Sequence, residues 1–445
     1  MSQTRDSFHT RIGFVLSAAG SAIGLGNIWG FPTQAANNGG GAFLVVYLIV
    51  TLLLALPALY AEIYIGNQTQ KNPVAALTQV CQTTIPRFAY GAGLFGLVGA
   101  ILMLSFYSIV AGWMVAHTLS PIAETAGFTD AAHWLSTAST SRNIVFTPLF
   151  IVLSGAIIHQ GVHAGIETWS ARLMPVLLIM LIALIIYILQ QDGASEGLRV
   201  YLQPDFSRLT DAKLIISAMG QAFFSLSIGV GGMMVYGSYL KKDNNIGKLV
   251  LSITALDTLI AFLAGLLIIP ALFVAQHAGQ HVFAHHKLIG EGQLIFQILP
   301  TLFHSMGSGG VVVSMVFFAL LSIAALTSTI SSTEVPVAYL VEDKHLSRPK
   351  ATWLVSITVL IVSMTIVAFF DSLFGAVIFW VSTFQLPIMG LFYFIVVGWL
   401  WQRGNKLSWA VQAENSWWLT CWANYLRFVC PILLTIVFVN VAFFA

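Results

Sequence analysis

Long runs of apolar residues, each about as long as a bilayer is thick, are the feature that most constrains this chain. The runs recur throughout the 445 residues, and only 8% of the residues are charged. A soluble domain carries about a quarter charged residues, so too few are present here to coat a soluble surface. A run of roughly 20 apolar residues crosses a bilayer as a helix because its backbone groups are then paired internally. The sequence therefore predicts an all-α membrane protein.

Eleven transmembrane helices are predicted from these runs. The segments between them are short except at 119–143, 191–211 and 276–307. The expected spans are 12–35, 41–67, 89–118, 144–161, 167–190, 212–240, 247–275, 308–341, 350–370, 372–401 and 424–444.

The basic residues indicate how these spans are oriented. With the N-terminus in the cytoplasm, fourteen Lys and Arg residues fall inside and five fall outside. This positive-inside bias predicts a multi-pass protein of the cell inner (plasma) membrane, with a cytoplasmic N-terminus and an external C-terminus. The net charge of only +2 argues against a nucleic-acid partner.

Two of the spans are interrupted by glycines at mid-membrane, at 17–27 (SAAGSAIGLGN) and at 220–232 (GQAFFSLSIGVGG). A helix that is broken there leaves unpaired N–H groups at one half-helix end and unpaired C=O groups at the other. The N–H end favours an anion such as a carboxylate, and the C=O end favours a cation. The alternative is that the glycines only allow close helix packing.

The broken spans begin two candidate five-helix units, 12–190 and 212–401. An N-terminal gate segment, 1–11, precedes them, and an additional helix, 424–444, follows. Two successive units with an odd number of spans have opposite topology in the membrane. Glycine-broken segments in matching places of such units indicate a transporter site between inverted repeats, which favours the functional interpretation over packing.

Three motifs carry a family resemblance. GLGNIWGFP at 24–32, followed by NGGGAF at 38–43, resembles the helix 1 signature of the neurotransmitter:sodium symporters. QAFFSLS at 221–227 resembles helix 6 of that family, and ALTSTIS at 325–331 resembles helix 8. The resemblance implies a leucine-transporter-like fold, a five-plus-five inverted repeat with unwound helices 1 and 6. It also implies sodium-coupled import of an amino acid, or of a similar carboxylate-bearing amine, by alternating access, as in the family's bacterial branch.

The resemblance further implies one or two sodium ions and no organic cofactor. Oxygen ligands suit a hard cation. The first sodium site is expected at the carbonyl of Ala22 and the side chains of Asn27, Ser225 and Asp257, with the substrate's carboxylate completing the shell. The second is expected at the carbonyls of Gly20, Ile23 and Ala324 and the hydroxyls of Thr327 and Ser328.

For the substrate, the resemblance implies that a carboxylate binds the N–H groups near Leu25 and Gly26 and the hydroxyl of Tyr107. Relatives that carry amines without a carboxylate have an acid at the position of Gly24, so a glycine there favours a substrate with its own carboxylate. The residues expected around the amino group are Ser21, Ala22, Phe224, Ser225 and Ser328, and those expected at the side-chain end are Met103, Ser227, Val230 and Ser332.

The same comparison implies gates on both sides of the site. Phe224 and Tyr107 would form the outer lid, and an ion pair of Arg5 with Asp343 would close the inner side, beside Phe8 and Tyr239. Further out, Gly30 replaces the family's usual arginine, whose aspartate partner corresponds to Asp371. Asp371 is either a solvated helix-end charge, the preferred interpretation, or a contact for a basic group on the substrate.

Two acidic residues, Glu62 and Asp257, are expected at or near mid-membrane depth. Buried acids are expensive in a membrane and indicate a function. A fixed carboxylate at Asp257 predicts chloride-independent transport, because it supplies the negative charge that other family members take from chloride. Glu62 is expected to accept hydrogen bonds from helix ends and to hold the broken first helix in place.

Other functions on the same scaffold remain open from the sequence. They are an amino-acid sensor, a channel and a proton-coupled transporter. An enzyme is disfavoured because no nucleophile–base pair, metal cluster or cofactor loop stands out. The expected partners are an amino-acid-like small molecule, sodium and the lipid bilayer, with the protein a monomer or weak dimer.

Overall fold

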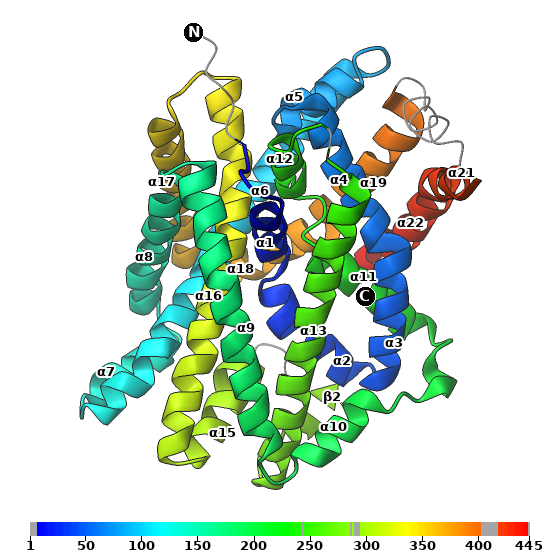
Figure 1. Cartoon of the computed structure of the whole chain (residues 1–445). Coiled ribbons are helices and arrows are strands. Elements are labelled where there is room, and N and C mark those ends of the chain that lie inside the picture. The colour runs from blue at the N-terminus through cyan, green and yellow to red at the C-terminus, as the bar shows by residue number, and fades with distance from the viewer. Residues whose placement is uncertain (1–6, 243, 285–286, 289–293, 402–416, 444–445) are drawn as a thin grey trace.

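Apolar helices of bilayer length dominate the computed structural model (Figure 1). It describes residues 7–242, 244–284, 287–288, 294–401 and 417–443. Within these ranges, nine helices are long and apolar enough to cross a bilayer. A bent pair, α1 (Arg11–Ala22) with η1 and α2 (Gly26–Gly30 and Phe31–Asn37), makes a tenth crossing. The chain is therefore an all-α, multi-pass membrane protein.

The nine helices that are not broken coincide with nine of the predicted spans, with ends that differ by a few residues. In chain order they are α3–η2–α4 (Gly41–Val50, Thr51–Ala55 and Leu56–Thr69), α6 (Pro86–Thr125), α8 (Thr140–Ile158), η3–α9 (Val162–Glu167 and Thr168–Leu189), α13 (Ile246–His277), α16 (Ser308–Glu342), α17 (Arg348–Ala368), α18–η6–α19–η7 (Phe370–Phe379, Trp380–Gln385, Leu386–Ile395 and Val396–Leu400) and α21–η9–α22 (Trp417–Asn424, Tyr425–Val429 and Cys430–Phe443).

Short elements occupy the connections between spans, including all three of the long ones. A two-stranded antiparallel hairpin in the third long connection was not predicted from the sequence. The connecting elements are α5 (Pro73–Val80), α7 (Thr129–Ser136), α10 (Ala194–Leu202), η4 (Phe206–Arg208), β1 (Phe283–Ala284), β2 (Lys287–Leu288), η5 (Leu294–Ile298) and α15 (Leu299–Ser305).

The first span is broken where the glycines predict it. Helix α1 ends at Ala22, and Ile23 has an extended backbone with φ −71° and ψ 103°. The chain turns helical again with η1, and the two halves of the span meet at an angle of 55°. The interruption at 23–25 is called break 1 below. In Figure 1, α1 lies in the middle of the bundle, and it packs against α9, α13 and α16.

The sixth span is broken more widely. Helix α11 (Ala212–Ser225) and helix α12 (Gly232–Ser238) are separated by 226–231, which is called break 2 below. Gly229 and Gly231 have φ values of +94° and +90°, in the region that only glycine adopts without strain. Because of this gap the sixth span is two short helices, so the prediction of eleven crossings and of two inverted five-helix repeats stays a prediction.

Candidate functional site

Gly24, the only glycine of break 1, lies against helices α6 and α16. The Leu25 N–H donates to the hydroxyl oxygen of Tyr107 at 3.2 Å. A Cβ atom on Gly24 would lie 2.7 Å from the Tyr107 hydroxyl and 2.6 Å from the Ser328 hydroxyl. No side chain fits there without displacing one of them. The break therefore presents peptide groups, rather than a side chain, to Tyr107 and Ser328.

A fully buried polar cluster joins the two breaks. The Asn27 amide donates to one carboxylate oxygen of Asp257 at 2.8 Å and to the Ser225 hydroxyl at 2.9 Å. The Ser225 hydroxyl donates to the other Asp257 oxygen at 2.9 Å. The Asn27 side-chain oxygen accepts from the Gly24 N–H at 3.2 Å. Three of the four side-chain and carbonyl ligands expected at the first sodium site thus lie together, and the fourth, Ala22, is the last residue of α1.

The residues expected at the second sodium site also converge, between α1 and α16. The Ser328 hydroxyl lies 3.2 Å from the carbonyl oxygen of Ile23 and 3.5 Å from that of Gly20. One residue earlier on α16, the Thr327 hydroxyl donates to the carbonyl of Ala324 at 3.0 Å. This arrangement supplies hydroxyl and carbonyl oxygens only, which is the chemistry that a hard cation prefers.

Phe224 covers the other side of break 1. A Cβ atom on Gly26 would lie 3.1 Å from the Phe224 ring, and 36% of Phe224 is exposed. The neighbouring Gln221 donates to the Gly26 carbonyl at 2.8 Å. This contact of Gln221 was not predicted. A polar amide side chain in an apolar helix, inside the motif at 221–227, could have indicated that it binds a backbone group.

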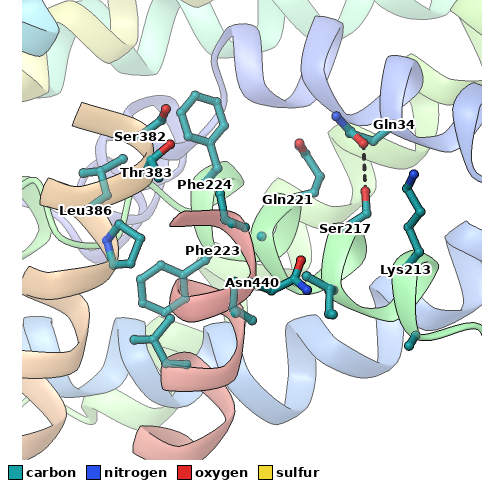
Figure 2. Close-up of a pocket in the computed structure, with 17 residues that line it drawn as sticks. Gln34, Lys213, Ser217, Gln221, Phe223, Phe224, Ser382, Thr383, Leu386 and Asn440 are labelled. Carbon is teal, nitrogen blue, oxygen red and sulfur yellow. Dashed lines mark hydrogen bonds between the residues drawn. The ribbon is translucent and has the colours of Figure 1, made fainter. Parts of the chain in front are cut away.

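A cavity of about 830 Å³ lies against α11, η6, α19 and α22 (Figure 2). Phe224 and Lys213 line it toward opposite ends of α11, with Gln221 and Ser217 between them. Gly24 and Tyr107 are not among the described residues that line this cavity. Phe224 therefore lies at the boundary between the open cavity and the buried groups around break 1.

Most of the remaining substrate candidates are buried, and Ser227 is half-buried. The Ser227 hydroxyl donates to the Ser21 carbonyl at 3.4 Å, which joins break 2 to α1. Met103 lies one helical turn before Tyr107, and Ser332 one turn after Ser328, so each shares a helix face with a residue at break 1. Val230 is part of break 2. The assignment of these residues to the side-chain end of a substrate stays a prediction.

The expected role of Glu62 was wrong in one respect, because this residue holds break 2 rather than break 1. Its carboxylate accepts from the N–H groups of Gly229 at 3.1 Å and Met234 at 3.4 Å. Glu62 thus binds the N–H group of Gly229, while the carbonyl group of the same residue accepts from the Gln385 amide at 3.1 Å. Sequence reasoning missed Gln385, whose only signal was an amide in an apolar span.

The gate candidates are placed in part. Asp343 is exposed and accepts from the Asn72 side chain at 2.9 Å, but its expected partner Arg5 lies outside the described residues. Asp371 is exposed in the first turn of α18, where the helix dipole stabilises an acid. The gating roles of all three residues stay predictions.

A buried network of polar side chains that was not predicted lies on the side of the bundle where α1 begins, next to Phe8. Glu334, on α16, accepts from Tyr239 at 2.6 Å and forms an ion pair with Arg348 at 2.6 Å. Arg348 also donates to the carbonyl of Ile158 at the end of α8 at 3.2 Å. Glu334 and Arg348 are fourteen residues apart in the sequence, on two helices, so no local pattern revealed the pair.

Comparisons with known proteins agree along nearly the whole chain. The profile of the Sodium:neurotransmitter symporter family matches residues 5–147 and 140–444. The sodium-dependent transporter YhdH of Bacillus subtilis is 32% identical over 455 residues, which cover 97% of this chain and 96% of that protein. A sodium-dependent transporter of Haemophilus influenzae is 30% identical over 469 residues, with 98% of each chain covered.

A solved structure is also similar. The crystal structure of MhsT in complex with L-phenylalanine matches with a TM-score of 0.81 and 34% sequence identity, covering 98% of this chain and 100% of that one. The fold, the two broken helices and the family profile thus lead to one conclusion. The chain belongs to the sodium:neurotransmitter symporter family and is a sodium-dependent transporter.

Proposed function

We propose that this protein imports an amino acid together with sodium by alternating access. The observation that carries the proposal is the pair of helix breaks joined by Asn27, Ser225 and Asp257. Peptide groups that are free of regular helix pairing can bind a carboxylate and a cation only where they line a shared site. Two breaks that meet at one polar cluster provide such a site in the middle of the bundle.

The substrate's carboxylate binds at break 1 in this proposal. The N–H groups of Leu25 and Gly26 begin the second half-helix, where the dipole favours an anion, and Tyr107 adds a hydroxyl. The space beside Gly24 is too small for an acidic side chain, so the negative charge has to come with the substrate. That the similar MhsT was solved with L-phenylalanine supports an amino acid as the substrate.

Sodium couples to this substrate through shared ligands. A sodium ion at Ala22, Asn27, Ser225 and Asp257 would also contact the substrate's carboxylate, so each strengthens the binding of the other. A second ion at Gly20, Ile23, Ala324, Thr327 and Ser328 would tie α1 to α16. Asp257 supplies a fixed negative charge beside the first ion, which supports transport that does not need chloride.

The direction of transport follows from the expected orientation of the spans. Substrate and sodium enter from outside past Phe224, which lies between the cavity and break 1. Tyr107 and Phe224 then close over the site, and the inner side opens. A sodium gradient concentrates the substrate only if both ligands bind the same state and neither moves alone.

The decisive experiment is uptake of a panel of labelled amino acids by proteoliposomes with an inward sodium gradient. We expect sodium-dependent accumulation of at least one amino acid, and the same rate when gluconate replaces chloride. Accumulation that needs a proton gradient instead of sodium would overturn the coupling. Binding without accumulation would indicate a sensor, and currents far above the uptake rate would indicate a channel.

A further inference from the structure

Glu167 is a buried acid that neither the sodium sites nor the substrate site uses. It ends η3, at the start of the fifth span, and only 5% of it is exposed. Its carboxylate accepts four hydrogen bonds. The donors are the His9 N–H at 3.0 Å, the Thr10 N–H at 3.1 Å, the Thr10 hydroxyl at 2.8 Å and the His163 ring at 2.9 Å.

Three of these four donors belong to the segment that leads into α1. Thr10 caps that helix, because its hydroxyl oxygen also accepts from the Gly13 N–H at 2.9 Å. Gly13 leaves room for the acid, since a Cβ atom there would lie 2.6 Å from the carboxyl carbon of Glu167. A carboxylate at the start of a helix is further stabilised by the helix dipole. Glu167 is therefore aimed at the N-terminal end of α1.

Helix α1 is held at this end and interrupted at the other. It has 12 residues and stops at break 1, where Ile23 is extended. A short half-helix next to an uncoiled stretch can pivot about that stretch, unless contacts hold its far end. The contacts at the far end are Glu167 and the ring of Phe8, which packs edge-on against Phe14 and Tyr236 at 5.3 and 5.5 Å between centroids.

A second contact between the same two segments accompanies the carboxylate. The rings of His9 and His163 stack with their centroids 3.6 Å apart and their planes at 10°. Both residues are exposed, whereas Glu167 is buried beneath them. The acid and the ring pair together fasten residues 9–10 to the turn that begins the fifth span.

We propose that Glu167 is a latch that keeps the N-terminal side of the transporter closed by holding α1 against the fifth span. Glu167 is a positioning residue, and the idea rests on the alternating-access function proposed above. When α1 pivots at break 1, the three hydrogen bonds from His9 and Thr10 break together and the carboxylate becomes hydrated. Hydrogen bonds to a charged acceptor are the strong class, so their loss shifts the balance between closed and open states.

The test measures the position of α1 directly, in the full-length protein in proteoliposomes. Spin labels are attached through cysteines at Ile12, which is 73% exposed on α1, and at Lys350, which is exposed on α17. The exposed Cys421 is first replaced by serine. Pulsed electron paramagnetic resonance then gives the distance distribution between the two labels.

We expect Glu167→Gln to lower the ratio of closed to open distances by about tenfold or more, because the amide nitrogen cannot accept from Thr10 or His9. Glu196→Gln, an exposed acid on α10, is the matched control and leaves the distribution unchanged. Thr10→Val removes the Thr10 hydroxyl, which is one of the donors to Glu167, and should also shift the distance distribution toward the open state. It also decides the question if Glu167→Gln does not fold.

The outcomes separate this proposal from the transport function. If the folded variants keep the distance distribution of the parent protein, the latch is overturned, whatever the parent transports. If the variants open but the parent protein accumulates no amino acid in the same vesicles, the transport proposal fails and the latch stands.

Discussion

Ser225 and Asp257 are joined by a 2.9 Å hydrogen bond from the hydroxyl to one carboxylate oxygen, with both side chains fully buried. Ser225 is the last residue of α11 before break 2, and Asp257 lies in the middle of α13. The other carboxylate oxygen binds Asn27, beside break 1. One carboxylate therefore fixes the positions of both breaks relative to each other.

The first prediction concerns the charge of this carboxylate. Asp257→Asn keeps the shape but removes the negative charge that faces the first sodium position. We expect the apparent sodium affinity of uptake to fall by about tenfold or more, since a charged ligand is lost from a buried site. We also expect added chloride to restore part of the activity. Sodium titrations of uptake, with chloride or gluconate as the anion, measure both effects.

The control for this prediction is Asp192→Asn, an exposed acid after α9. It should leave both titrations unchanged. If Asp257→Asn transports with the sodium affinity of the parent protein, Asp257 is not a ligand of the coupled ion.

The second prediction concerns the space beside Gly24. Gly24→Ala places a methyl group 2.6 Å from the Ser328 hydroxyl and 2.7 Å from the Tyr107 hydroxyl, so one of these groups has to move. We expect substrate affinity to fall by about tenfold or more, because an ångström-scale shift of binding groups has effects of this size. Binding of labelled substrate to the purified protein measures it.

Gly91→Ala is a matched control, because a Cβ atom there meets nothing within 4 Å. Equal substrate affinity in Gly24→Ala and in the parent protein would mean that the substrate does not approach break 1.

The position of the breaks was predictable because glycine leaves a local signature in the sequence. The stretch 17–27 predicted the interruption at Ile23, and 220–232 predicted the one around Gly229. The partners of the breaks were predictable only where the family resemblance supplied them, as for Asn27 with Asp257. The pairing of Glu62 with break 2, instead of break 1, depends on how α4 packs against α12, which no sequence pattern encodes.

Glu167 illustrates the same limit. Three of its four hydrogen bonds join residue 167 to residues 9 and 10, which are far from it in the sequence. In the sequence, an acidic residue at the start of an apolar span indicates only a charge at the membrane boundary. Only the three-dimensional structure reveals that it faces the beginning of a broken helix.

The third prediction concerns the support of break 2. In Glu62→Gln, the amide nitrogen cannot accept from the N–H groups of Gly229 or Met234, so at least one of them loses its partner. We expect the free energy of unfolding to fall by about 2 kcal/mol, the usual cost of a buried unpaired group next to a lost charged acceptor. Thermal unfolding in detergent measures the loss, and saturating substrate should recover part of it, because ligand binding stabilises the folded state.

Glu124→Gln serves as the comparison, because that side chain is 50% exposed. Its melting temperature should match the parent protein. A Glu62→Gln variant as stable as the parent would show that break 2 is held by other contacts.

The fourth prediction concerns Phe224 as a lid over break 1. Phe224→Ala removes the ring that lies over Gly26 and separates it from the 830 Å³ cavity. Because the ring is 36% exposed, its removal should cost little stability, but bound substrate should escape faster. We expect the dissociation rate of labelled substrate to rise by about tenfold, with a smaller change in the association rate, since affinity changes within one site act mostly through dissociation. Phe206→Ala, in an exposed turn, should leave both rates unchanged. Dissociation at the parent rate from Phe224→Ala would place the outer barrier elsewhere, with Tyr107 or the α18 segment as the next positions to test.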